Sequence, residues 1–105
     1  MGWVISHMNI IIPTKCLRET ETWIAFYHPK PTNKFHVLLM PKHPYKSMMD
    51  IHEEEAIIMK DVIVMAQSIV NEFKLEQSGY RLLTNGGKYQ DIPYLHFHLI
   101  ADELK

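Results

Sequence analysis

The sequence has little that would suit a secreted or membrane-spanning protein. Its single cysteine, Cys16, cannot form a disulfide within the chain, which favours a reducing compartment and predicts a cytoplasmic protein. No apolar run approaches the roughly 20 residues that cross a bilayer, so no membrane partner is expected. Neither charge sign dominates, with 11 Lys and Arg against 12 Asp and Glu, and this balance argues against nucleic acid as the main partner.

Internal repeats, low-complexity tracts and linkers rich in glycine or serine are also missing. A chain of 105 residues therefore predicts one domain over residues 1–105. Residues 1–7 fit no downstream pattern, and Ser6-His7-Met8 resembles the end of an expression leader. Two alternatives stay open: the natural chain begins at Met1, or it begins at Met8.

The pattern of apolar residues predicts strands, then one long helix, then strands again. The helix is expected over Ile51–Leu75, with Asp50 as its N-cap and apolar residues recurring every three or four positions. This order is typical of an α+β fold with an antiparallel sheet and helices on one face. The segments predicted as strands are Leu17–Thr20, Thr22–Tyr27, Phe35–Met40, Arg81–Thr84 and Tyr94–Ile100.

The last predicted strand carries the main functional signal, two of the seven histidines at alternate positions. Side chains alternate between the faces of a strand, so Leu95, Phe97 and Leu99 point one way, toward the helix. His96 and His98 then stand together on the other face, ~6–7 Å apart along the chain. Like-charge repulsion lowers the pKa of such neighbours and favours neutral rings that can attack or ligate. The alternative is a polar outer face of a surface strand.

Other residues could complete a site on that face. Asn85-Gly86-Gly87 is a turn signal whose amide groups can form an anion-binding concavity. His36 opens another predicted strand and either shares the face of His96 and His98 or lies at a solvated strand end. His28 follows a strand and lines either a pocket or a turn. Phe26 stacks on a ligand base or belongs to the core, whereas His43 and His52 are expected on the surface.

Several segments occur together in a recognisable order. They are Trp23-Ile24-Ala25-Phe26, then Pro31 with the stretch His36 to His43, the long helix, Gly79-Tyr80-Arg81 leading to Asn85, and Gln90-Asp91-Ile92-Pro93 before Tyr94 to Ile100. In this order and spacing the chain resembles the histidine triad (HIT) family, from about Cys16 to Ile100. The resemblance implies a HIT-like α+β fold, with an antiparallel sheet of about five strands and one long and one short helix packed on one face.

The resemblance also implies a chemistry. Family enzymes hydrolyse or transfer nucleoside monophosphate groups through a nucleotidyl-histidine intermediate, generally without metal, so no cofactor is expected. Counting from Gln90 makes His96 the nucleophile, while His98 and His36 orient it and hold phosphate oxygens. Asn85 fixes geometry as a further catalytic residue. Substrate-binding positions are Phe26 at the base, Gln90, Asp91, Tyr94 and His28, and the expected partners are a purine nucleotide or nucleotide conjugate and a second copy in a homodimer.

The sequence departs from the family pattern at positions that bear on activity. Tyr94 occupies the first histidine's place, although its hydroxyl can still donate to a phosphate oxygen. Asp91 stands where the family has Ser or Thr near the leaving group, and a carboxylate there repels phosphate. His28 falls about where many members carry an acidic residue that binds ribose hydroxyls. An alternative register makes His96 the first histidine and His98 the nucleophile.

Three functions therefore compete. The leading one is a nucleotide-processing hydrolase or transferase that works in the presence of a chelator. The second is a nucleotide-binding protein without turnover, in which Tyr94 and Asp91 mark lost chemistry. The third is a zinc site built from His96, His98 and His36, which suit a tetrahedral ion.

Overall fold

The computed structural model describes residues 3–5, 11–13 and 16–102. His7 and Met8, on which the alternative start depends, lie outside the described residues. The strands are β1 (Trp3–Ile5), β2 (Ile11–Pro13), β3 (Arg18–Glu19), β4 (Trp23–Tyr27), β5 (Phe35–Pro41), β6 (Arg81–Thr84) and β7 (Phe97–Ala101). The helices are α1 (Ile57–Glu72) and α2 (Leu75–Ser78), with 3₁₀ turns at Met48–Asp50, Glu53–Glu55 and Gly87–Tyr89.

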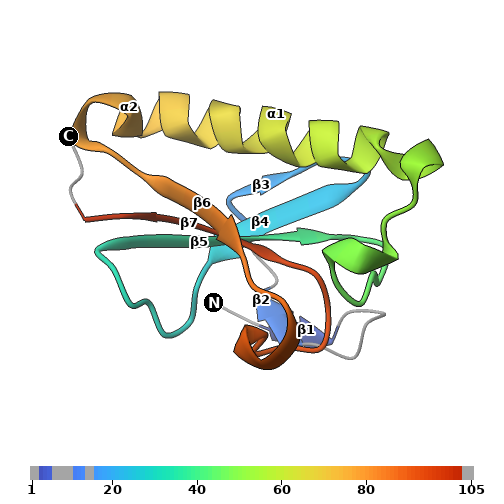
Figure 1. The fold of residues 1–105 in the computed structure, drawn as a ribbon. Helices are drawn as coiled ribbons and strands as arrows, with labels where there is room; N and C mark the ends of the chain where they lie inside the picture. Colours follow the sequence, from blue (N-terminus) through green and yellow to red (C-terminus); the bar gives the residue numbers. More distant parts are fainter. Residues whose placement is uncertain (1–2, 6–10, 14–15, 103–105) are drawn as a thin grey trace.

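A five-stranded antiparallel sheet in the order β3-β4-β5-β7-β6 forms the centre of the fold. Helix α1 runs across one face of this sheet, and α2 follows at its end (Figure 1). β1 and β2 pair in a separate two-stranded sheet. The predicted α+β class and arrangement of helices are therefore confirmed.

The core fills the space between the sheet and α1. Apolar side chains alternate with the strand period, so that each strand sends every second residue toward the helix. The indole of Trp23 is fully buried and donates a hydrogen bond to the carbonyl of Ile58 at 2.9 Å. The sheet contributes Trp23, Ala25, Phe35, Val37, Leu39, Phe97 and Leu99, the segment before β7 contributes Leu95, and α1 contributes Val62, Met65, Ala66, Ile69 and Val70.

The prediction of one helix from Ile51 to Leu75 with Asp50 as N-cap is wrong at both ends. Ile51 and His52 are extended, because the groups before α1 satisfy one another locally: the carboxylate of Asp50 accepts the amide of Lys46 at 3.1 Å. At the other end Lys74 is left-handed, with φ of 54°, and this break turns the fully buried Leu75 into the core.

The last strand is also shorter than predicted at its start. β7 begins at Phe97, and the preceding residues are held by other partners. The amide of Leu95 donates to the carbonyl of Tyr45 at 2.8 Å, and the hydroxyl of Thr84 donates to the carbonyl of His96 at 2.7 Å. The alternation of faces persists nonetheless, since Leu95 is buried in the core beneath the helix.

Candidate functional site

The face of the sheet away from α1 carries the histidines. In the strand register Leu38 of β5 lies between Phe26 of β4 and His98 of β7, and His98 pairs with Leu83 of β6. His36 pairs with Ile100, one step along the same face. Neighbouring strands therefore place His36 diagonally beside His98, which is the first of the two alternatives that the sequence left open.

His36 and His98 are joined through their rings, and the backbone determines which nitrogen carries each proton. The amide of Thr32 donates to Nδ1 of His36 at 3.2 Å, so a neutral His36 ring carries its proton on Nε2. That Nε2 lies 2.8 Å from Nδ1 of His98 and donates to it. The proton of His98 then sits on Nε2, a buried atom without a hydrogen-bond partner among the described residues. His98 thus offers an unused donor.

In His96 the proton lies on the other ring nitrogen, Nδ1 instead of Nε2. Its Nδ1 lies 2.8 Å from the main-chain oxygen of Tyr94, which can only accept, so the proton sits on Nδ1. A neutral His96 therefore keeps a free electron pair on Nε2, and a nucleophile attacks through such a pair. Its ring centre is 5.0 Å from that of His98. The two rings combine one electron-pair donor with one hydrogen-bond donor.

A further ring, His28, stacks on this pair. Its centre lies 4.3 Å from that of His36, with planes 28° apart, and 6.1 Å from that of His98. The amide of Lys30 donates to Nδ1 of His28 at 2.9 Å, which leaves Nε2 as the donor of the neutral ring. The sequence left His28 between a pocket and a turn, and the structure places it in both.

Burial favours the neutral forms of His28, His36 and His98. It lowers the pKa of His36 to about 4, with smaller contributions from the rings of His28 and His98. Burial also lowers the pKa of His98, and the neighbouring rings of His96 and His28 act in the same direction. For His28 burial is again the main cause of a lowered pKa, followed by His96. The carboxylate of Asp91 opposes both shifts at His28 and His98.

These rings border a cavity of about 390 Å³ that brings together residues from the sheet and from two loops. Loop residues after β4 and around the turn at Gly87–Tyr89 complete its wall. Its lining residues are His28, Lys30, Thr32, His36, Leu83, Asn85, Asp91, His98 and Ile100. The predicted site residues His28, His36, Asn85, Asp91 and His98 therefore meet around one space.

Other predicted site residues lie off that lining. His96 is only 3 % exposed and is not among the residues that line the cavity. Phe26 is buried with Leu38 and Met40, and Tyr94 packs against that apolar cluster. The side-chain amide of Gln90 donates to the carbonyl of Lys46 at 2.6 Å. The described structure thus gives Phe26 and Gln90 packing and hydrogen-bonding roles.

Two polar residues of the lining, Lys30 and Thr32, were missed from the sequence. Both act through backbone amides that hold His28 and His36, as well as through their place on the wall. Their signal was the short, proline-rich segment between the two histidines, which can fold its amides back onto a flanking ring. The residue types alone do not show which backbone amide faces which ring nitrogen.

The remaining histidines of the described residues stand apart from the cavity. His43 is exposed and packs edge-on against Tyr45, with ring centres 4.6 Å apart. The hydroxyl of Tyr45 in turn donates to Glu55 at 2.8 Å. His52 is exposed beside the same segment. The prediction that His43 and His52 are surface residues is confirmed.

Among residues 16–102 no group of three or more His, Cys, Asp or Glu side chains is arranged to hold a metal ion. The reason is visible in the ring pairing, since the facing nitrogens of His36 and His98 are occupied by each other. The third alternative, a zinc site at His96, His98 and His36, therefore lacks support in the donor geometry. In the described part of the chain no helix has the length and apolarity to span a membrane.

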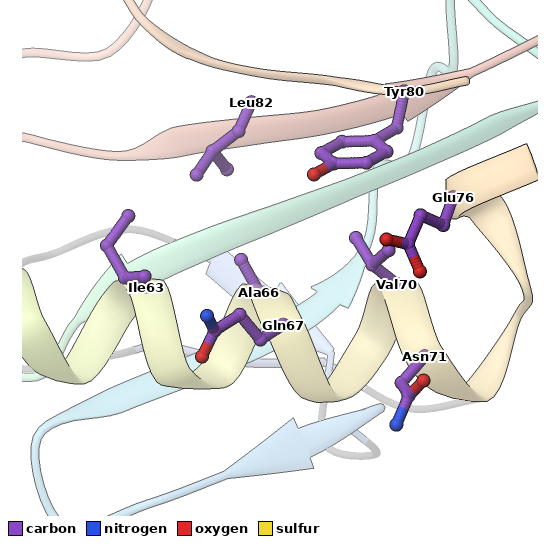
Figure 2. A pocket seen from close by; sticks show the side chains of 8 residues that line it. All are labelled: Ile63, Ala66, Gln67, Val70, Asn71, Glu76, Tyr80 and Leu82. Atoms are coloured by element: carbon purple, nitrogen blue, oxygen red, sulfur yellow. The ribbon is translucent and has the colours of Figure 1, made fainter.

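A second cavity, of about 410 Å³, lies on the helix side between α1 and β6. Figure 2 shows Ile63, Ala66 and Val70 of α1 facing Leu82 and Tyr80 across it. Gln67, Asn71 and Glu76 complete the lining, which holds no histidine. We call this cavity the α1–β6 groove.

Comparisons with known proteins identify the family and agree with the fold. The HIT domain family model matches residues 10–104. An uncharacterized HIT-like protein of Buchnera aphidicola is 32% identical over 93 residues, 87% of this chain and 83% of that protein. An adenosine 5′-monophosphoramidase of Saccharomyces cerevisiae is 34% identical over 91 residues, 85% of this chain and 54% of that protein. The structure of a histidine triad protein from Clostridium difficile superposes with a TM-score of 0.81 and 31% identity, covering 88% of this chain and 82% of that one.

Proposed function

The chain belongs to the HIT family, and from this premise we propose that it acts at the α-phosphate of a nucleoside monophosphate conjugate, with His96 as nucleophile. The observation that carries the proposal is the opposite polarity of two adjacent rings. His96 keeps its electron pair on Nε2 because Nδ1 binds the carbonyl of Tyr94, whereas His98 carries its proton on a free Nε2. A nucleophile beside a donor suits attack on a charged phosphorus.

In the first step Nε2 of His96 attacks the α-phosphorus and forms a phosphorus–nitrogen bond. The bond from phosphorus to the leaving group breaks, and the leaving group takes the bonding electrons and a proton from water. The Nε2 proton of His98 and the side-chain amide of Asn85 donate to the phosphate oxygens. The His98 ring is held by its hydrogen bond to His36 before the substrate arrives, so little reorganisation of this donor is needed.

In the second step a water oxygen attacks the same phosphorus. The bond to Nε2 breaks, the ring regains its electron pair, and the water loses one proton to solvent. The products are the nucleoside monophosphate and the free ring. An acceptor other than water would give transfer rather than hydrolysis, so the hydrolase and transferase outcomes share one intermediate.

We further propose a purine nucleotide conjugate as ligand, a homodimer as the assembly and the cytoplasm as the location. The cavity of about 390 Å³ is within the range that binds small ligands. For the dimer, the exposed apolar side chains of the α1–β6 groove and the free edge of β6 offer a surface that a second copy can cover.

The decisive experiment measures hydrolysis of adenosine 5′-phosphoramidate in the presence of EDTA, for the wild type and His96→Ala. We expect turnover by the wild type and a loss of at least about 10³-fold in the variant, because the covalent step is removed. His43→Ala, which removes an exposed ring outside the cavity, is the matched control and keeps its activity. The low exposure of His96 favours one alternative, a protein that binds nucleotides without turnover. An inert wild type that still binds AMP would support that alternative, and undiminished turnover by His96→Ala would refute the proposed site.

A further inference from the structure

We propose that Asp91 selects the leaving group: it favours conjugates in which phosphorus is bonded to an amine nitrogen over those in which an oxygen bridges to a second phosphate. The inference rests on the proposed function and identifies the substrate class of the same site. It concerns a carboxylate that none of the steps above uses.

Asp91 is the one acidic side chain among the residues that line the histidine cavity. It is exposed, and its carboxylate forms no hydrogen bond or ion pair with any residue in the described ranges 3–5, 11–13 and 16–102. Its charge nevertheless reaches the rings, since it raises the pKa of His28 and of His98 against the effect of burial. A free carboxylate therefore stands within electrostatic range of the ring that would hold the phosphate.

The other polar lining groups are mostly donors. Lys30 is a cation at the wall, Asn85 carries an amide, and the neutral rings of His28 and His98 each carry a proton on Nε2. One phosphate can be satisfied by such donors. The carboxylate of Asp91 needs the opposite kind of partner, a ligand group that carries hydrogens or positive charge.

Asp91 also comes from a different part of the cavity wall than the rings. It follows the turn at Gly87–Tyr89, whereas His36 and His98 project from the sheet. In-line displacement sends the leaving group away from the attacking nitrogen. A leaving group that departs from the sheet face therefore moves toward the loop wall that Asp91 supplies.

The chemistry of the two substrate classes differs at that point. As the P–N bond breaks, the amine nitrogen takes the bonding electrons and a proton from water, and its N–H groups can donate to a carboxylate. In an anhydride the bridging oxygen has no hydrogen, and the departing phosphate brings negative charge toward Asp91. Attraction to one class and repulsion of the other both contribute to specificity.

The test compares adenosine 5′-phosphoramidate with diadenosine triphosphate for the wild type, Asp91→Asn and Glu54→Gln. The Asp91→Asn change keeps the shape of the side chain and removes its charge, while Glu54 is an exposed acid outside the cavity. The wild type is expected to favour the phosphoramidate in kcat/KM. Asp91→Asn should lower that preference at least about tenfold, mainly by improving the anhydride, and Glu54→Gln should leave it within about twofold.

A binding measurement keeps the inference testable if no variant turns over substrate. In the His96→Ala background, adding Asp91→Asn should strengthen ADP binding relative to adenosine 5′-phosphoramidate by about tenfold. A changed binding ratio without turnover would support the inference and refute the proposed catalysis. An unchanged ratio in both assays, or a wild type that prefers the anhydride, would overturn the role of Asp91. Failure of both ligands to bind would overturn the inference as well.

Discussion

The histidine cavity and the α1–β6 groove are nearly equal in volume, about 390 and 410 Å³, yet they differ in what they can do. The groove is lined by apolar side chains with amides, one carboxylate and a tyrosine hydroxyl. The histidine cavity gathers rings whose protons are directed by backbone groups, with a lysine and an asparagine beside them. Volume therefore does not identify the reactive site, whereas the arrangement of donors and electron pairs does.

The difference has a physical origin in how each wall is built. The groove lies between α1 and β6, which is an edge strand. Its wall is therefore the margin of the hydrophobic core, where no further strand covers the apolar side chains among the described residues. The histidine cavity lies over β5 and β7, the inner strands, where side chains are fixed by neighbours on both sides. Rings held in this way keep one orientation and one tautomer, which suits a chemical step more than a docking surface.

The largest expected effect separates the two regions by their response to acid. The pKa of His36 is lowered to about 4 in the folded protein. Between about pH 6.5 and pH 4 this ring is therefore protonated in the unfolded chain and neutral in the folded protein. The free energy of unfolding should therefore fall as the pH drops from 6.5 to 4. His36 should account for on the order of 2 kcal/mol of this loss, or roughly 30-fold in the unfolding constant.

Denaturant titrations over this pH range test the assignment to one ring. The variant His36→Gln should show a flatter pH dependence, whatever its stability at pH 7. His43→Gln, which removes an exposed ring outside the cavity, should retain the wild-type slope. Equal slopes for the wild type and His36→Gln would contradict the buried neutral ring.

The next effect belongs to the groove and to the proposed dimer. Ile63 lines the groove and is 45% exposed, whereas its neighbour Val64 is 53% exposed and does not line it. In a dimer that covers the groove, Ile63→Lys buries a charge without a partner and should raise the dissociation constant at least about tenfold. Val64→Lys is the matched control and should leave the dimer intact.

Light scattering over a dilution series measures this effect. Retention of the wild-type mass by Ile63→Lys would place any dimer elsewhere. If instead Ile63→Lys abolished phosphoramidate turnover with no change in mass, the groove would be part of the reactive site, and the contrast between the two cavities would fail.

The sequence predicted which face of the sheet would carry the chemistry, because alternation in a strand depends on residue order alone. Leu95, Phe97 and Leu99 lie in the core, and His98 lies on the other face, as expected. It could not predict the tautomers. Those depend on the amides of Thr32 and Lys30, whose positions follow from how the loop closes on β5.

The difference between what residue order determines and what tertiary contacts determine also explains where the sequence-based predictions differ from the structure. The periodic apolar residues of α1 predicted a helix correctly, but its start depended on whether Asp50 caps the helix or bonds to Lys46, and the sequence allows both. The residues alone left Phe26 between a ligand base and the core, and only the family resemblance implied the base. The burial of Phe26 with Leu38 and Met40 follows from cross-strand neighbours, which only the register reveals.

The smallest expected effect concerns Tyr94, at the place where the family pattern has a histidine. Nδ1 of His96 donates to the main-chain oxygen of Tyr94, and every residue type supplies that oxygen. The hydroxyl of Tyr94 forms no hydrogen bond with the part of the chain that the structure describes, and its ring packs near Phe26. Tyr94→Phe should therefore change kcat/KM for the phosphoramidate by less than about threefold, since the group that orients His96 is retained. A loss beyond about tenfold, measured beside a Tyr89→Phe control on the exposed turn, would mean that the hydroxyl donates to the phosphate and that the side chain replaces the missing histidine.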